Sequence, residues 1–260
     1  MSDLSVIKSG SHPLIKHLVQ LRTCKKYRQT SNAVFIEGEK VIFDLASNHT
    51  FEKLIVVEGA TLPPSIRFVE KHVISEQNFK KISGVNTNST LAATLKKPEA
   101  RTFKSDENLL IFDRIQDPGN MGMLVRSALA FGYSGVFLVE GSVDYFNDKT
   151  VRTSRGAVFS LPFQEGSLQE LLLLASKNKA RLLIADLEGK SPESITKDAN
   201  PFYLVVGNEG QGVSAKIKNK GEAITLATHP HVESLNVAAA GSILLYLLQH
   251  LLQPENSIEV

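Results

Sequence analysis

The strongest constraint on the fold is a regular alternation of short apolar runs and longer helical stretches in the second half of the chain. The apolar runs predict strands at residues 109–112, 136–139, 182–185, 203–206 and 223–226. Helices are predicted at residues 121–131, 167–177 and 236–252. Apolar strands that alternate with helices are typical of a parallel sheet covered on both faces. The predicted fold class is therefore α/β.

A smaller set of alternating elements precedes this region. Strands are predicted at residues 34–36, 53–57, 67–74 and 91–95, and helices after Ser11 and over residues 38–46 and 76–82. Residues 96–108 are polar and charged and contain Pro98, which is typical of a domain boundary. We therefore expect a small α/β domain at residues 1–97, a linker at residues 98–107 and a larger domain at residues 108–260.

Charge is unevenly distributed between the two parts. Residues 1–105 contain 16 Lys and Arg against 9 Asp and Glu, a net charge of +7. Residues 106–260 contain 13 against 18, a net charge of −5. A basic part joined to an acidic part suggests a module that docks on a polyanion. A solvated lysine-rich surface would give the same count, so charge alone leaves both interpretations open.

Composition argues against a membrane protein and against a disulfide scaffold. The chain of 260 residues is 42% hydrophobic, but its apolar runs are too short or too interrupted to span a bilayer. The single cysteine, Cys24, excludes an intramolecular disulfide and a cysteine metal cluster. The first residues lack the pattern of a signal peptide, so a cytoplasmic location is expected. His229 and His231 alone make a poor metal site, and no metal is expected.

The first chemistry-bearing segment joins the strand at residues 109–112 to the next helix. Its Asp-Pro-Gly turn is followed by Asn120, which would cap the helix if its role were only structural. Arg126 lies six residues further on, about 120° from Asn120 around a helix. Its neighbours are apolar, so Arg126 is either a surface group with a buried stem or a charge that faces a ligand.

The second segment, Gly-Asn-Glu-Gly-Gln-Gly at residues 207–212, follows an apolar strand. Its glycines allow close backbone approach to a ligand. The glycine spacing differs from that of dinucleotide-binding loops, and the lysine of a P-loop is missing. The carboxylate of Glu209 would repel phosphates but suits a sulfonium or ammonium group. The structural alternative is a plain turn with a solvated Glu209.

The third segment begins the last helix. Ser234 and Asn236 straddle the expected helix cap, and small residues follow at 238–241. A capped core helix would explain this pattern structurally. The C-terminal ends of strands in an open α/β sheet converge on one crevice. We therefore expect the three segments to lie close together there.

Together the three segments resemble the signature motifs of the SpoU/TrmH-type RNA ribose 2′-O-methyltransferases. The resemblance is strongest over residues 109–252, where the motifs occur in order. It implies a deep trefoil knot, which the general rule of unthreaded connections would not predict. It further implies S-adenosylmethionine as cofactor and a homodimer through the knotted domain. The looser N-terminal match resembles an RNA-binding domain related to certain ribosomal proteins.

The resemblance also implies roles for individual residues. Asn120, Arg126, Glu209, Ser234 and Asn236 fall on catalytic positions of the family motifs. Gly207, Leu226 and Leu235 fall on cofactor-binding positions. Arg126 would be either the general base or an anchor for an RNA phosphate that polarises the hydroxyl. The stretch at residues 228–231, Thr-His-Pro-His, departs from the small residues usual before the third motif.

The implied activity is methyl transfer to a ribose 2′-hydroxyl of ribosomal or transfer RNA, with ribosomal RNA favoured and DNA excluded by the missing hydroxyl. One alternative is a non-catalytic RNA-binding relative that retains the fold. A second is an α/β enzyme that binds a nucleotide through residues 207–212. The intact motif side chains argue against the first alternative, and the missing basic residues beside the loop argue against the second.

Overall fold

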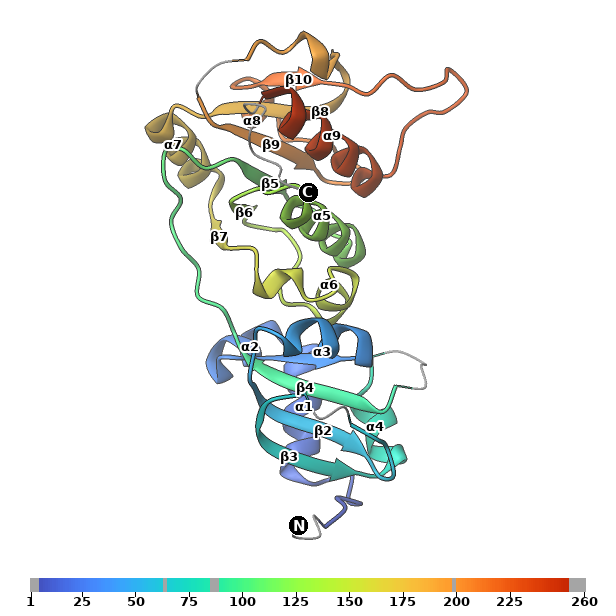
Figure 1. The fold of residues 1–260 in the computed structure, drawn as a ribbon. Helices are drawn as coiled ribbons and strands as arrows, with labels where there is room; N and C mark the ends of the chain where they lie inside the picture. Colours follow the sequence, from blue (N-terminus) through green and yellow to red (C-terminus); the bar gives the residue numbers. More distant parts are fainter. Residues whose placement is uncertain (1–4, 63–64, 85–88, 198–199, 253–260) are drawn as a thin grey trace. The chain divides into compact units, whose positions relative to one another are not determined.

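The structure, a computed structural model, describes residues 5–62, 65–84, 89–197 and 200–252. Its contacts divide the chain into two compact units (Figure 1). The first comprises residues up to Pro98 together with Asp144–Phe159, and the second comprises Glu99–Val143 with the residues from Ser160 onward. No helix in the described part of the chain is long and apolar enough to cross a membrane.

The first unit is built on a mixed four-stranded sheet of order β1-β4-β2-β3. The strands are β1 (Ala33–Glu37), β2 (Phe51–Val57), β3 (Phe68–Ile74) and β4 (Leu91–Lys96). Only β2 and β3 pair in parallel, whereas β4 runs antiparallel to both β1 and β2. The helices are α1 (Pro13–Thr23), α2 (Lys25–Ser31), α3 (Glu39–Ala46), α4 (Glu76–Ile82) and α6 (Asp148–Thr153).

Both faces of this small sheet are covered. Helices α1 and α4 supply Leu18 and Phe79 to a cluster that contains Phe35 and Ile55 of the sheet. Helices α3 and α6 contact the sheet as well, and α6 belongs to the segment Asp144–Phe159. Burial from both sides explains why every residue of β1 is buried instead of alternating.

The segment Asp144–Phe159 is held in the first unit by specific contacts. Asp144 forms an ion pair with Arg28, a buried side chain that also donates to the carbonyl oxygens of Leu21 and Arg22. A Cβ atom on Gly156 would lie 2.9 Å from Cγ of Leu45, so this glycine permits close packing. The predicted linear division at residues 1–97, 98–107 and 108–260 does not include this return of the chain.

The second unit contains a fully parallel six-stranded sheet of order β10-β8-β9-β5-β6-β7 (Figure 1). Its strands are β5 (Leu109–Asp113), β6 (Gly135–Val139), β7 (Phe163–Gly166), β8 (Arg181–Lys190), β9 (Phe202–Gly207) and β10 (Glu222–Ile224). Its helices are α5 (Pro118–Ala130), α7 (Leu168–Asn178), α8 (Ala215–Lys218) and α9 (Val237–Leu252). Short 3-10 turns are η1 (Ala157–Phe159) in the first unit and η2 (Pro192–Ser194) in the second. The predicted α/β class with a parallel sheet is confirmed.

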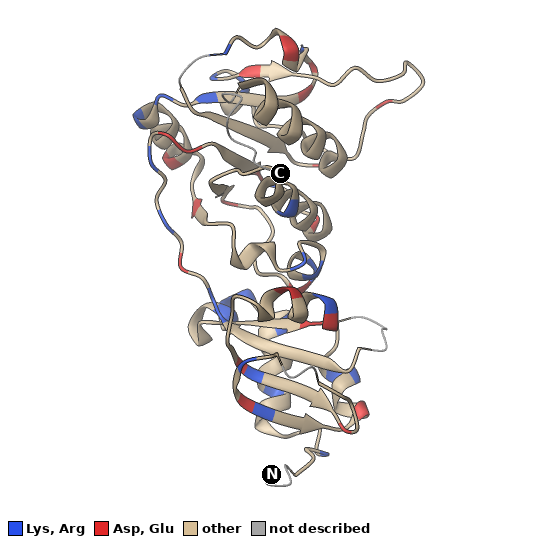
Figure 2. Cartoon of the chain, in the orientation of Figure 1, with Lys and Arg blue, Asp and Glu red and all other residues tan. Residues whose placement is uncertain are grey.

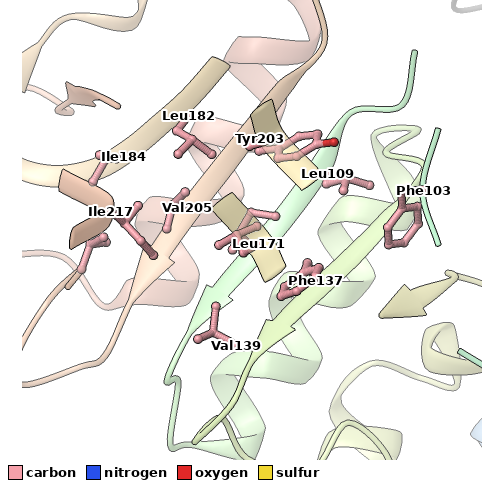
Figure 3. Close-up of a cluster of buried hydrophobic side chains, with 13 residues drawn as sticks. Phe103, Leu109, Phe137, Val139, Leu171, Leu182, Ile184, Tyr203, Val205 and Ile217 are labelled. Carbon is pink, nitrogen blue, oxygen red and sulfur yellow. The ribbon is translucent and has the colours of Figure 1, made fainter. Parts of the chain in front are cut away.

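Helices cover both faces of this sheet. On one face, Leu171 of α7 and Ile217 of α8 pack with the strand residues Phe137, Ile184 and Val205 (Figure 3). On the other face, α5 and α9 pack against each other. A Cβ atom on Gly241 of α9 would lie 2.5 Å from Cδ2 of Leu124, so this glycine is needed for the close approach of the two helices.

Candidate functional site

The start of α5 frees Asn120 from the capping role that it could have taken. Asp117 is the N-cap, and its side chain accepts a hydrogen bond from the backbone N–H of Asn120 at 2.8 Å. Pro118 occupies the first helical position, which favours this arrangement because proline has no N–H to satisfy there. The interpretation of Asn120 as the helix cap is therefore wrong, and its side chain is available for another contact.

Glu209 connects two of the three predicted segments. Its carboxylate accepts hydrogen bonds from the backbone N–H groups of Gln116 and Asp117 and from Nδ2 of Asn120, each at 3.1 Å. Partial burial acts to raise the pKa of Glu209, but the hydrogen bonds from Asn120 and this backbone outweigh it, and the pKa is lowered. The carboxylate is thus ionised at neutral pH, and this stabilisation is lost only as the pH falls through the lowered pKa.

Asn236 adds the third segment. Its Nδ2 donates to Oδ1 of Asn120 at 3.1 Å, while its own Oδ1 accepts from the backbone N–H groups of Ala238 and Ala239 at the start of α9. Asn236 therefore caps α9 itself, whereas the sequence placed the cap between Ser234 and Asn236, and it also binds Asn120. Glu209, Asn120 and Asn236 form one continuous hydrogen-bonded chain, which we call the polar network.

The Gly-rich loop between β9 and α8 has a fixed shape. Oδ1 of Asn208 accepts from the backbone N–H groups of Gly210 and Gln211, and its Nδ2 donates to the carbonyl of Arg114. The backbones of Asn208 and Gly212 exchange two further hydrogen bonds. These contacts order the loop before any ligand binds, which lowers the cost of binding.

Gly207 is required by this loop itself. A Cβ atom there would lie 2.2 Å from the carbonyl carbon of Gly212 and 2.3 Å from the backbone nitrogen of Val213. Any side chain at position 207 must therefore displace the loop backbone. Gly207→Val would disturb the loop as well as the space beside it, so it does not test ligand contact cleanly.

A cavity of about 710 Å³ lies beside the polar network, wholly within the second unit. It is lined by the middle of β8, the end of β9, the Gly-rich loop, the end of β10 with the residues after it, and the start of α9. The lining includes Gly207, Glu209, Leu226, Ser234, Leu235 and Asn236. Six of the eight predicted site residues thus line the cavity. Asn120 does not line it but is hydrogen-bonded to two residues that do, Glu209 and Asn236.

Arg126 lies apart from this cavity wall. Its side chain is exposed on α5, and no described residue forms a hydrogen bond or ion pair with it. Met123 and Leu129, three residues before and after it, are exposed as well, at 50% and 38%. Because residues three apart share a helix face, Arg126 lies on an exposed, mainly apolar stripe. The structure therefore does not bring Arg126 into contact with the polar network.

Charged residues that the sequence interpretation did not single out also line the cavity. Asp186 follows directly on the apolar run of β8, and Lys218 ends α8. An acid directly after a buried apolar run was the signal that could have identified Asp186. With Glu209 and Glu233, the lining contains three carboxylates against one lysine. Within the described residues, no cluster of three or more His, Cys, Asp or Glu side chains could hold a metal ion.

Comparison with known proteins shows the family of the chain. Residues 107–246 match the profile of the SpoU rRNA Methylase family. The chain therefore belongs to this family. It is 32% identical over 246 residues to the 23S rRNA (guanosine(2553)-2′-O)-methyltransferase RlmP of Bacillus subtilis, covering 94% of this chain and 98% of that protein.

Two further proteins are similar over most of the chain. The 23S rRNA (adenosine(1067)-2′-O)-methyltransferase of Streptomyces laurentii is 25% identical over 260 residues, covering 95% of this chain and 96% of that protein. The crystal structure of the SpoU methyltransferase AviRb from Streptomyces viridochromogenes, in complex with AdoMet, has a TM-score of 0.80 at 21% identity. It covers 92% of this chain and 97% of that chain, and shows that the two share a fold.

Proposed function

We propose that the protein transfers a methyl group from S-adenosylmethionine to a ribose 2′-hydroxyl of ribosomal RNA. The observation that carries this proposal is the polar network, in which side chains from three separate segments meet beside a cavity. Membership in the SpoU rRNA Methylase family and the names of the two rRNA 2′-O-methyltransferases that the chain resembles support the same activity.

The cavity fits S-adenosylmethionine better than a nucleoside triphosphate. Its volume of about 710 Å³ lies in the range of small-molecule sites. Three carboxylates and one lysine among its lining residues give a negative wall, which would repel a triphosphate and attract a cationic ligand. Gly207, Leu226 and Leu235 would hold the cofactor through backbone groups and apolar contact.

When bound, S-adenosylmethionine supplies a methyl group made electrophilic by a positively charged sulfur. The protein must then align the 2′-hydroxyl with that methyl and help to remove the hydroxyl proton. Glu209 holds Asn120, and Asn120 holds Asn236, so the two amides and the neighbouring Ser234 are positioned to orient the reacting groups. Arg126 acts on the RNA side, as an anchor for the phosphate beside the reacting ribose.

Calorimetric titration tests the cofactor assignment. Wild-type protein should bind S-adenosylmethionine and its product S-adenosylhomocysteine and should not bind ATP. Binding of ATP without binding of S-adenosylmethionine would favour a nucleotide enzyme instead. Binding of S-adenosylmethionine without any RNA methylation would favour a non-catalytic relative.

Loss of the Glu209 carboxylate should disable the polar network. In Glu209→Gln, the amide retains one acceptor oxygen but presents an NH₂ group to donors that need an acceptor. We expect methyl transfer to fall about 100-fold or more, as when a group that orients a reacting atom is misplaced. The measurement is single-turnover methylation of RNA. Glu188→Gln, an exposed acid on β8 outside the cavity lining, should keep wild-type rates.

We propose further that the first unit binds the RNA backbone. Lysines and arginines are spread over the helices and strands of this unit (Figure 2), and residues 1–105 have a net charge of +7. Deleting the unit is a poor test for two reasons. First, the segment Asp144–Phe159 packs in this unit and would lose its partners. Second, a truncation that removes residues 1–105 would also remove Phe103, which lies in the core cluster of the second unit. Charge reversal at exposed lysines avoids both difficulties.

The pair Lys25→Glu and Lys26→Glu, at the start of α2, should weaken RNA binding. The slope of log affinity against log salt concentration is negative, and its magnitude should fall by about 1 for each replaced lysine that contacts a phosphate. Cofactor affinity should stay unchanged. The matched control is Lys177→Glu with Lys190→Glu, exposed lysines of the second unit that carry the same change of charge. Equal loss in both pairs would contradict a docking role for the first unit.

We propose that the protein acts as a homodimer through the exposed stripe on α5 and α9. The stripe consists of Met123, Leu129, Ile243 and Tyr246, between 38% and 50% exposed, on two helices that pack together. Arg126 lies among these residues, so a second copy on this face would enclose it next to an active site.

We also propose the deep trefoil knot of the family, in which the chain after β9 is threaded. An experimental structure traced through residues 200–252 tests it.

Ile243→Glu should convert the dimer into a monomer. A charge placed at the centre of an apolar interface costs more than the contact can return. Light scattering should show half the wild-type mass, and methylation should fall with it. Leu173→Glu on α7, where the leucine is 62% exposed, is the matched control and should remain dimeric. A wild-type protein that is already monomeric would contradict the proposal.

A further inference from the structure

Asp186 is the acidic residue of the cavity wall that the proposed reaction does not use. It lies in the middle of β8 (Arg181–Lys190), just beyond Ile184, where the pairing of β8 with β9 ends. Ile184 of β8 pairs with Val205 of β9, so two residues further along each strand Asp186 is level with Gly207. It is therefore adjacent to the Gly-rich loop, and its side chain is only 18% exposed while lining the cavity.

The Asp186 carboxylate is held in place by hydrogen bonds that leave part of its acceptor capacity unused. Its Oδ2 accepts from Nζ of Lys218 at 2.5 Å, and its Oδ1 accepts from the backbone N–H of Glu188 at 3.2 Å. Burial acts to raise the pKa of Asp186, but the hydrogen bonds from Lys218 and from the backbone of Glu188 and Leu187, with the charge of Lys218, outweigh it, so the pKa is lowered. An ionised carboxylate has about four lone-pair sites, which leaves room for another donor.

The ion pair with Lys218 determines which kind of ligand group suits the Asp186 carboxylate. Because Lys218 neutralises Asp186, this part of the wall has little net charge to offer a cation. Among the described residues, no lysine pairs with the other lining acids, Glu209 and Glu233. A neutral hydroxyl donor suits Asp186 better. Asp186 follows the buried part of β8, and an acid that binds a ribose hydroxyl at the ligand crevice is a recurring solution in open α/β sheets.

We infer that Asp186 accepts a hydrogen bond from a hydroxyl of the cofactor ribose, with Lys218 fixing the carboxylate. This inference rests on the proposed use of S-adenosylmethionine and adds one residue and one recognised group to it. Asp186 binds the nucleoside part of the ligand, and the polar network faces the reacting end. Asp186 is thus a determinant of cofactor affinity that takes no part in proton transfer.

Calorimetry with stable ligands tests this assignment. S-adenosylhomocysteine and its 2′-deoxy and 3′-deoxy analogues are titrated into wild-type protein, Asp186→Asn and the control Glu188→Gln. For the full ligand, Asp186→Asn should lose about tenfold or more in affinity, the effect of removing a charge-assisted hydrogen bond. For the analogue that lacks the bonded hydroxyl, wild type and Asp186→Asn should bind alike. Thermal unfolding without ligand checks that the variant is folded.

Each other outcome has a defined meaning. If Asp186→Asn loses the same factor with all three ligands, the carboxylate contacts the adenine or the amino-acid part, and the ribose assignment is overturned. If the folded variant binds all ligands as wild type does, Asp186 is only a structural partner of Lys218. If wild-type protein binds none of the ligands, the proposed cofactor is wrong, and the inference fails with it.

Discussion

Replacing Arg126 by alanine should reduce methyl transfer by several orders of magnitude while leaving the affinity for S-adenosylmethionine nearly unchanged. Arg126 does not line the cavity, so its loss removes no cofactor contact. Its exposed guanidinium has no partner among the described residues and is free to bind RNA. Removing a preorganised charge beside the reacting hydroxyl typically costs on the order of 100- to 1000-fold for each lost interaction.

Two variants make this result specific. Arg126→Lys should also fail, because a point charge cannot replace the planar fork of donors that grips a phosphate. Arg101→Ala removes another arginine, which pairs with Glu107 in the second unit and does not line the cavity, and should keep the wild-type rate. Light scattering should show that Arg126→Ala is still a dimer. A folded, dimeric Arg126→Ala that methylates normally would make Arg126 a plain surface residue.

Ala240→Phe should abolish cofactor binding in a protein that remains folded. Ala240 lies on α9, lines the cavity and is partly exposed, so an aromatic ring at this position would fill cavity space. Ala240→Phe tests the pocket more cleanly than Gly207→Val would, because a side chain at position 207 would clash with the loop backbone. Calorimetry with S-adenosylmethionine measures binding, and circular dichroism with thermal unfolding measures folding.

Ala227→Phe is the matched control for this variant. Ala227 is exposed and lies between the lining residues Leu226 and Thr228 but does not line the cavity itself. The same change in side-chain volume should therefore leave binding within a few fold of wild type. Normal cofactor affinity in folded Ala240→Phe would place the cofactor outside this cavity.

The strands of the second unit follow from the sequence wherever both faces are buried. The predicted runs at residues 109–112, 136–139, 182–185 and 203–206 lie within β5, β6, β8 and β9. By contrast, β7 was not predicted, because only Phe163 of its four residues is buried and the strand lies at the sheet edge. An edge strand has one neighbour and little apolar signal.

Long-range contacts explain what the sequence interpretation missed. The return of Asp144–Phe159 to the first unit depends on the pair of Arg28 and Asp144, which are 116 residues apart. The sequence left capping of α5 open as the structural alternative for Asn120, because Asn and Asp both cap helices. Asp117 takes that position because Pro118 fits directly after it. The motifs did predict a shared location for Asn120, Glu209 and Asn236, since strand C-termini converge.

The central claim is tested most directly by the product of the reaction. Wild-type protein is incubated with ribosomal RNA lacking the modification and with S-adenosylmethionine labelled in its methyl group, and the RNA is then hydrolysed in alkali. A methylated 2′-oxygen cannot attack the neighbouring phosphate, so the label should appear in an alkali-resistant dinucleotide, and Arg126→Ala should give none. Label released as a methylated base in a mononucleotide, or no transfer by the wild-type protein, would contradict the claim.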